Sequence, residues 1–202
     1  THVSYAAAAS GLLAVLCLQV GMVDTNEALL LAFTGTIGGI LPDVDLQHSH
    51  PSSIMFSLIG IATAFGVIFT LDRDISVLEM WFVGLCIFTA IRYPVWTLFH
   101  RYTTHRGSIH SLVAALLAMF TTTSLAYHWL KKPDFVAWLL GLFTLIGFLI
   151  HLLLDELYSV DFTNRRIKRS FGTALKIIDS RKPVKSTLLV IVTIAMWFGT
   201  PN

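Results

Sequence analysis

Long apolar runs separated by short polar stretches follow one another along the whole chain. A helix crosses a hydrocarbon layer about 30 Å thick with about 20 predominantly apolar residues, within a range of roughly 17–25. Pro, Asp, Arg or Lys stand between the runs that approach this length. These runs cover residues 5–22, 28–41, 54–71, 77–99, 112–129, 135–157 and 186–198. Because the second and last runs are short, the pattern predicts an all-α, polytopic membrane helical bundle of six to seven spans.

The composition favours a membrane protein over a soluble one. Hydrophobic residues make up 55% of the 202 residues and charged residues 13%, whereas soluble domains contain roughly 45–50% apolar and about 25% charged residues. The mean hydropathy is +0.73. Since the apolar content extends along the whole chain, we expect a single membrane domain, 1–202. The formal charge of +2 is too small to indicate direct nucleic-acid binding.

Basic residues are concentrated on one predicted side of the bundle. If the runs alternate in direction, the N-terminus and the stretches 42–53, 100–111 and 158–185 share a side. Ten of the 14 Lys and Arg residues fall there, three fall on the other side, and Arg92 lies inside a run. The positive-inside rule makes the first side cytoplasmic. We therefore predict a multi-pass protein of the bacterial inner (cytoplasmic) membrane.

The stretch 164–185 mixes Lys and Arg with Ile, Phe and Leu. This mixture is typical of an amphipathic interfacial helix on an anionic cytoplasmic leaflet, so anionic lipids are expected partners. A solvated basic loop is the alternative. Within the second run, Gly35 and Gly39 form a GxxxG pattern, which predicts a closely packed span.

Most histidines lie on the same predicted side as the basic residues. Of the eight in the chain, only His128 does not. For His48 and His50 we expect hydrogen bonds at the headgroup boundary. Candidate metal ligands come from four separate parts of the chain: His2, the pair Asp43 and Asp45, the pair His105 and His110, and the pair His151 and Asp155. The sequence predicts that these groups converge at the cytoplasmic face.

Local sequence indicates how two of these groups are presented. Pro42 is expected to stop the second helix and leave 43–45 extended, so that Asp43 and Asp45 point the same way. His151 and Asp155 are four residues apart on a predicted helix and therefore share a face. Ionisable groups after a long apolar run are costly within a membrane and usually functional.

The third group surrounds a predicted helix start. Gly107 and Ser108 indicate a break followed by an N-cap. This places His105 in a loop and His110 in the first turn of the fifth helix.

A shared divalent cation would keep the carboxylates charged and satisfy them together with neutral imidazoles. Three Asp and three or four His exceed the needs of one catalytic zinc, which typically has three protein ligands and a water, so one or two ions are expected. The mixed set favours zinc, with manganese or iron as alternatives, and Cys17 and Cys86 lie apart from it. A metal-bound water is acidified toward neutral pH, which is hydrolytic chemistry.

Further polar residues could complete such a site. Arg92 and Arg101 could hold an anionic substrate group, although a buried ion pair is an equal alternative for Arg92. Arg106 could orient the reacting group, and His100 or Glu156 could move protons.

Three motifs resemble the YdjM-like family of inner-membrane-associated metal-dependent hydrolases, which includes a LexA-binding member. They are LPDVD at 41–45, HRGSIHS at 105–111 and HLLLD at 151–155. The resemblance covers most of the chain, and HRGxxHS is its most specific part. It implies metal-site roles for the residues Asp43, Asp45, His105, His110, His151 and Asp155, and also for His2.

The function predicted from these observations is a membrane-embedded metal-dependent hydrolase. It would cleave a phosphate or carboxylic ester, lipid-linked because the site opens at headgroup level, through metal-activated water at the cytoplasmic face. The alternative is a non-catalytic binding or assembly protein with a structural metal site, which uses 164–185 to dock a soluble cytoplasmic protein. A cation transporter is third, since the external halves of the runs offer little beyond Glu79 and His128.

Overall fold

The structure is a computed structural model that describes residues 2–45, 50–70, 76–102, 109–161, 166–167, 175–179 and 181–201. The chain divides into two compact units. Unit 1 comprises Thr1–Pro42 and Arg106–Asn202, and unit 2 comprises Asp43–His105. The units are described separately.

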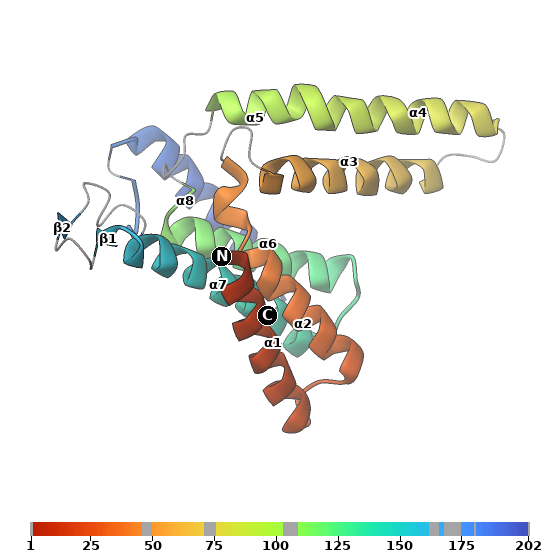
Figure 1. The fold of residues 1–202 in the computed structure, drawn as a ribbon. Helices are drawn as coiled ribbons and strands as arrows, with labels where there is room; N and C mark the ends of the chain where they lie inside the picture. The colour runs from red at the N-terminus through yellow and green to blue at the C-terminus, as the bar shows by residue number, and fades with distance from the viewer. Residues whose placement is uncertain are drawn as a thin grey trace. The chain divides into compact units, whose positions relative to one another are not determined.

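Unit 1 is built mainly from helices (Figure 1). Its elements are α1 (His2–Gln19), α2 (Thr25–Gly38), α6 (Leu112–His128), α7 (Asp134–Leu157), α8 (Pro183–Trp197) and the short antiparallel strands β1 (Val160–Asp161) and β2 (Arg166–Ile167). A 3-10 helix, η1 (Leu41–Asp45), follows α2 and crosses the boundary between the units.

Helix α7 is the centre of unit 1. It packs against α1, α2 and α6, and α8 packs against α6. Its 24 residues include Leu140, Phe143, Phe148 and Leu152, all almost completely buried. At 1.5 Å per residue the helix is about 36 Å long, enough to cross a bilayer.

Glycines let α2 and α7 approach until their backbones touch. A Cβ added to Gly147 would overlap the carbonyl oxygen of Gly35, and one added to Gly38 would overlap the carbonyl oxygen of Thr144. A Cβ on Gly39 would overlap the Ala6 side chain of α1. The close packing predicted from Gly35 and Gly39 is therefore confirmed.

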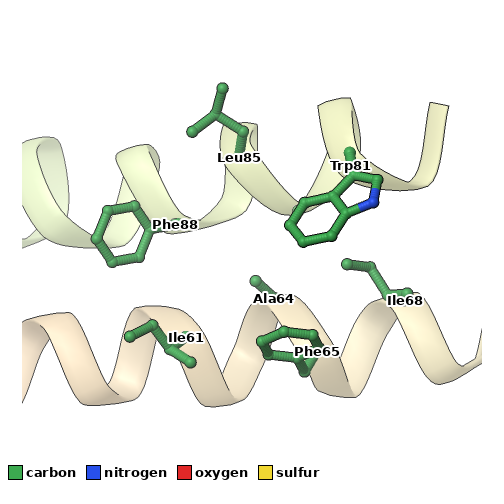
Figure 2. A pocket seen from close by; sticks show the side chains of 8 residues that line it. Ile61, Ala64, Phe65, Ile68, Trp81, Leu85 and Phe88 are labelled. Atoms are coloured by element: carbon green, nitrogen blue, oxygen red, sulfur yellow. The ribbon is translucent and has the colours of Figure 1, made fainter. Parts of the chain in front are cut away.

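Unit 2 is a helical hairpin. Helix α3 (His50–Thr70) packs against α4 (Val77–Ala90), which continues through a π-helix, η2 (Ile91–Val95), into α5 (Trp96–Tyr102). Pro94 has no backbone N–H to donate, and the wider π turn accommodates it without ending the helix. Between α3 and α4 lies an apolar pocket of about 180 Å³, with Phe65 on one side and Trp81 on the other (Figure 2).

Within the described residues, four helical segments are long and apolar enough to cross a membrane: His2–Gln19, Ser52–Phe69, Val77–Arg101 and Asp134–Leu157. Helices α6 and α8 are apolar but shorter. The all-α fold is thus confirmed, together with four candidate spans. Helices also occupy the regions of the remaining predicted spans, and a total of six to seven spans stays a prediction. Large apolar side chains such as Phe69 and Trp129 are more than four-fifths exposed, as suits contact with lipid.

A continuous helix over 164–185 is not confirmed. Arg166–Ile167 pairs with β1, and 175–179 are non-helical, with a parallel bridge between Lys176 and Ser111. The next helix begins only at Pro183. Residues 164–165, 168–174 and 180 lie outside the described residues.

Candidate metal centre

Helix ends from distant parts of the chain meet at one place in unit 1. The start of α1, the C-terminal end of α2, the segment before α6 and the end of α7 contribute His2, Gly39, His110 and His151 respectively. The His2 and His151 rings lie 4.8 Å apart between centroids, and the His110 and His151 rings 6.1 Å apart. Three of the predicted groups, those of His2, His110 and His151, therefore lie together in the structure.

His151 is fixed by the backbone of α2. Its Nδ1 donates a hydrogen bond to the carbonyl oxygen of Gly39 at 2.7 Å, and the ring is about 1% exposed. Because a carbonyl oxygen can only accept, Nδ1 carries a proton, and Nε2 is the ring nitrogen that could bind a metal ion. A hydrogen bond of this kind commonly orients a metal-binding histidine. The close approach of α2 and α7 at their glycines makes this bond possible.

Asp155 is the carboxylate around which the histidines gather. Its Oδ1 lies 3.3 Å from Nε2 of His2, and its Oδ2 lies 3.5 Å from Nε2 of His110 and 3.9 Å from Nε2 of His151. The predicted sharing of one helix face by His151 and Asp155 is confirmed by the last distance. The Nε2 atoms of His2, His110 and His151 thus each lie within 4 Å of an Asp155 carboxylate oxygen.

The centre is buried on one side and accessible on the other. The side chains of His110 and His151 are at most 1% exposed, whereas those of His2 and Asp155 are 21% and 14% exposed. Tyr158 is half exposed, and its ring centroid lies 5.4 Å from that of His2. The centre is therefore open on the side of His2 and Tyr158.

His110 lies just before α6, which corrects the prediction that it occupies the first turn. Ser111 is the N-cap, because its Oγ accepts from the N–H of Ala114 at 3.3 Å and the helix begins at Leu112. The N–H groups of Leu112 and Val113 donate to the carbonyls of residues 176 and 177. These bonds satisfy the first donors of the helix. The local sequence reading placed the cap at Ser108, which lies outside the described residues.

Asp43 lies in a 3-10 helix, so the prediction of an extended 43–45 segment was wrong. Helix α2 ends at Gly38, and Pro42 is tolerated in the first turn of the 3-10 helix, where its missing N–H costs little. Residues two apart on a 3-10 helix do not share a direction. Asp43 directly follows the fully buried Pro42. One ligand atom each from Asp43, His110 and His151 lie within 4.8 Å of one another, so these residues could hold a metal ion.

His100 belongs to a hydrogen-bond network within unit 2. Its Nδ1 donates to the carbonyl of Trp96 at 2.8 Å, which leaves its Nε2 to accept from the hydroxyl of Ser52 at 3.1 Å. Trp96 Nε1 donates to the same hydroxyl at 3.0 Å. In this arrangement both ring nitrogens of His100 are hydrogen-bonded to other residues of unit 2.

The remaining predicted residues are distributed as follows. Arg92 donates to Ser53 Oγ at 2.5 Å and lies over the rings of Tyr93 and Trp96. Arg101 is exposed at the end of α5. Glu156 is buried next to Asp155 in sequence, on α7. His48, His105 and Arg106 lie outside the described residues. For Asp45 and His50 only the backbone is described.

Two features of the centre had not been assigned from the sequence. The Gly39 carbonyl accepts the hydrogen bond from His151. A backbone acceptor cannot be recognised from the sequence, because every residue has a carbonyl group. Tyr158 follows His151 by seven residues, a spacing that places both on one helix face and could have indicated it.

One comparison with known proteins identifies the family of the chain. Neither a curated protein nor a solved structure matches the chain. The family model described as YdjM inner membrane protein matches residues 1–198. Nearly the whole chain is covered, and it therefore belongs to the YdjM inner membrane protein family.

Proposed function

We propose that this protein is a membrane-embedded metal-dependent hydrolase. Its substrate is a lipid-linked phosphate or carboxylic ester, and its centre faces the cytoplasm. The observation that carries the proposal is the convergence of His2, His110, His151 and Asp155 from separate helix ends. Asp43 is a further ligand, and the family motifs add Asp45 and His105.

The donor set fits one or two divalent ions of the zinc, manganese or iron type. Imidazole nitrogens and carboxylate oxygens are the donors that these ions take, and His151 is already held in the tautomer that offers Nε2. A bound ion would compensate the Asp155 charge, which is costly to bury beside neutral rings. When bound, the ion would acidify a water and polarise the ester oxygen.

Protein groups supply the other parts of the mechanism. The two fully buried rings, His110 and His151, give the centre a rigid wall. His2 lies on the accessible side of the centre, 3.3 Å from Asp155. Glu156 is proposed to move protons, and Arg106 and Arg101 are proposed to orient the anionic substrate.

Access of water to the bound ion distinguishes a catalytic metal from a structural one. A catalytic ion keeps an exchangeable water position, whereas a structural ion has a closed shell of protein ligands. The partial exposure of His2 and Asp155 supports an open position. In the alternative, the ion only joins the helix ends, and the basic stretch 164–185 docks a soluble partner.

Metal content of matched histidine variants tests the site. The purified protein is expected to hold on the order of one ion per chain, and His151→Ala to lose it. His128→Ala is the control, because His128 bonds the Gly199 carbonyl at the far end of α6. Unchanged metal content in His151→Ala would refute the assignment.

Hydrolysis assays on phospholipids and aryl phosphates then test the reaction. We expect turnover by the wild type and His128→Ala, and none by His151→Ala. Metal uptake without turnover of any substrate would favour the assembly role.

A further inference from the structure

A second feature of unit 1 is an apolar groove between α6 and α8. It has a volume of about 300 Å³, at the lower end of the roughly 300–1,000 Å³ of ligand pockets. Its lining consists of Val113, Leu116, Phe120, Val190, Thr193, Ile194, Trp197 and Phe198. The Thr193 hydroxyl donates to the Leu189 carbonyl at 2.7 Å, so its hydrogen-bonding capacity is used within α8. The groove therefore offers hydrocarbon contacts.

The groove has a buried floor and an exposed rim. Phe120 and Thr193 are 6–7% exposed, whereas Ile194 and Trp197 are more than half exposed. Both helices are apolar, and the chain belongs to an inner membrane family. Since both helices are predicted spans, lipid is the expected medium outside the groove, and hydrocarbon chains are the species available to fill it.

The groove begins beside the metal centre. Val113 is three residues after His110, and from Val113 to Phe120 the lining extends about 10 Å along α6 at 1.5 Å per residue. Helices α6 and α8 run parallel: Leu189 packs with the start of α6, and Trp197 contacts Phe120 at 5.0 Å between ring centroids. The start of α8 therefore lies at the same end as His110.

That end is positively charged. The chain at 176–177 bonds the first N–H groups of α6, and the Asp179 carbonyl accepts from Ser186 Oγ and the Lys182 N–H. The segment that pairs with α6 carries Lys176, and the start of α8 carries Lys182 and Lys185. Lys176 also lies 3.3 Å from Asp179. Cationic side chains at headgroup level attract anionic lipid.

We propose that this groove holds one acyl chain of an anionic phospholipid, with its headgroup at the lysine end beside His110. Identification of this lipid as the substrate rests on the proposed hydrolase function, but its binding does not. Because a chain moves from bilayer hydrocarbon into protein hydrocarbon, the groove adds little hydrophobic free energy. Its role is to align the headgroup, and the lysines supply the preference for anionic lipid.

Photo-crosslinking tests the binding without any need for activity. The probe is phosphatidylglycerol with a diazirine in one acyl chain, added to the full-length protein, and labelled peptides are identified by mass spectrometry. We expect labelling concentrated on the α6 and α8 peptides. Phosphatidylcholine with the same chain should label them less. Equal labelling of α3 and α4 peptides, or equal labelling by both lipids, overturns the proposal.

Two pairs of matched variants localise the chain. Leu116→Trp and Ile194→Trp fill the groove, whereas Leu125→Trp and Ile191→Trp place the same ring on exposed positions outside its lining. Because the indole ring would take the space of the acyl chain, labelling should fall about tenfold in the first pair, which corresponds to about 1.4 kcal/mol. It should not change in the second. Wild-type labelling in both groove variants overturns the proposal. Because Leu116 and Ile194 lie on different helices, the test can still be read from one variant if the other does not fold.

Metal and activity measurements separate this inference from the proposed function. If the groove labels as expected but His151→Ala retains its metal, the metal site fails and the lipid site stands. If the protein hydrolyses phospholipid while Leu116→Trp and Ile194→Trp process long and short acyl chains as the wild type does, the groove assignment fails and the hydrolase stands.

Discussion

Replacement of Gly147 by alanine should disturb the metal centre from inside the helix packing. The added Cβ would overlap the Gly35 carbonyl oxygen and lie 2.9 Å from the backbone nitrogen of Gly39. Both obstacles are backbone atoms, so no side-chain rotation relieves the overlap, and α2 and α7 must separate. Gly147 is one helical turn before His151, whose ring is bonded to the Gly39 carbonyl at 2.7 Å. The same separation therefore breaks that bond.

The magnitude follows from three contributions. Overpacking of a close-packed interface costs about 1–3 kcal/mol, and loss of one buried hydrogen bond costs about 1 kcal/mol. The higher helix propensity of alanine returns up to about 1 kcal/mol. Gly147→Ala should thus lower the free energy of unfolding by about 1–4 kcal/mol. Loss of the group that orients a ligand should also weaken metal binding by roughly 10–100-fold.

Thermal unfolding and metal titration of the detergent-purified protein measure both effects. Gly11→Ala is the control, since a Cβ on that α1 residue meets nothing within 4 Å. It should leave metal affinity unchanged and stability equal or up to about 1 kcal/mol higher. If Gly147→Ala retains wild-type metal affinity and stability, the link between glycine packing and the orientation of His151 is wrong.

Two other predictions concern the helix start and the metal. Ser111→Ala removes the N-cap of α6 and should lower stability by about 1 kcal/mol, with Ser111→Thr close to wild type in thermal unfolding. A fall of equal size in both variants would contradict the capping role. A chelator should lower the unfolding temperature of the wild type, since an ion at 100 times its Kd contributes about 2.7 kcal/mol. The same chelator should not affect His151→Ala, and an equal decrease in both would place the metal elsewhere.

The sequence predicted the helices well because their apolar runs are long and bounded by polar residues. The observed bounds of α6 and α7 differ from the predicted ones by about one residue. The pairing of His151 with Asp155 was also predictable, since it depends only on helical periodicity.

The sequence was a poor guide where local geometry depends on neighbouring chain segments. Pro42 can end one helix or begin the next, and residue types alone do not decide between these roles. Ser108 and Ser111 are both good N-caps by composition. In the structure the cap is at Ser111, where the N–H groups of residues 112 and 113 donate to the carbonyls of residues 176 and 177. This pairing involves a distant segment and cannot be seen from the local sequence. The Gly39 carbonyl could not have been assigned, because every residue carries one.

The most direct test of the central claim is X-ray absorption spectroscopy of the zinc-loaded protein. If the described cluster is the metal centre, the spectrum will show imidazole scattering from nitrogen at about 2.0–2.1 Å together with carboxylate oxygen. The imidazole contribution will decrease in His151→Ala and remain in His128→Ala. A spectrum without imidazole, or one that His151→Ala leaves unchanged, would contradict the account.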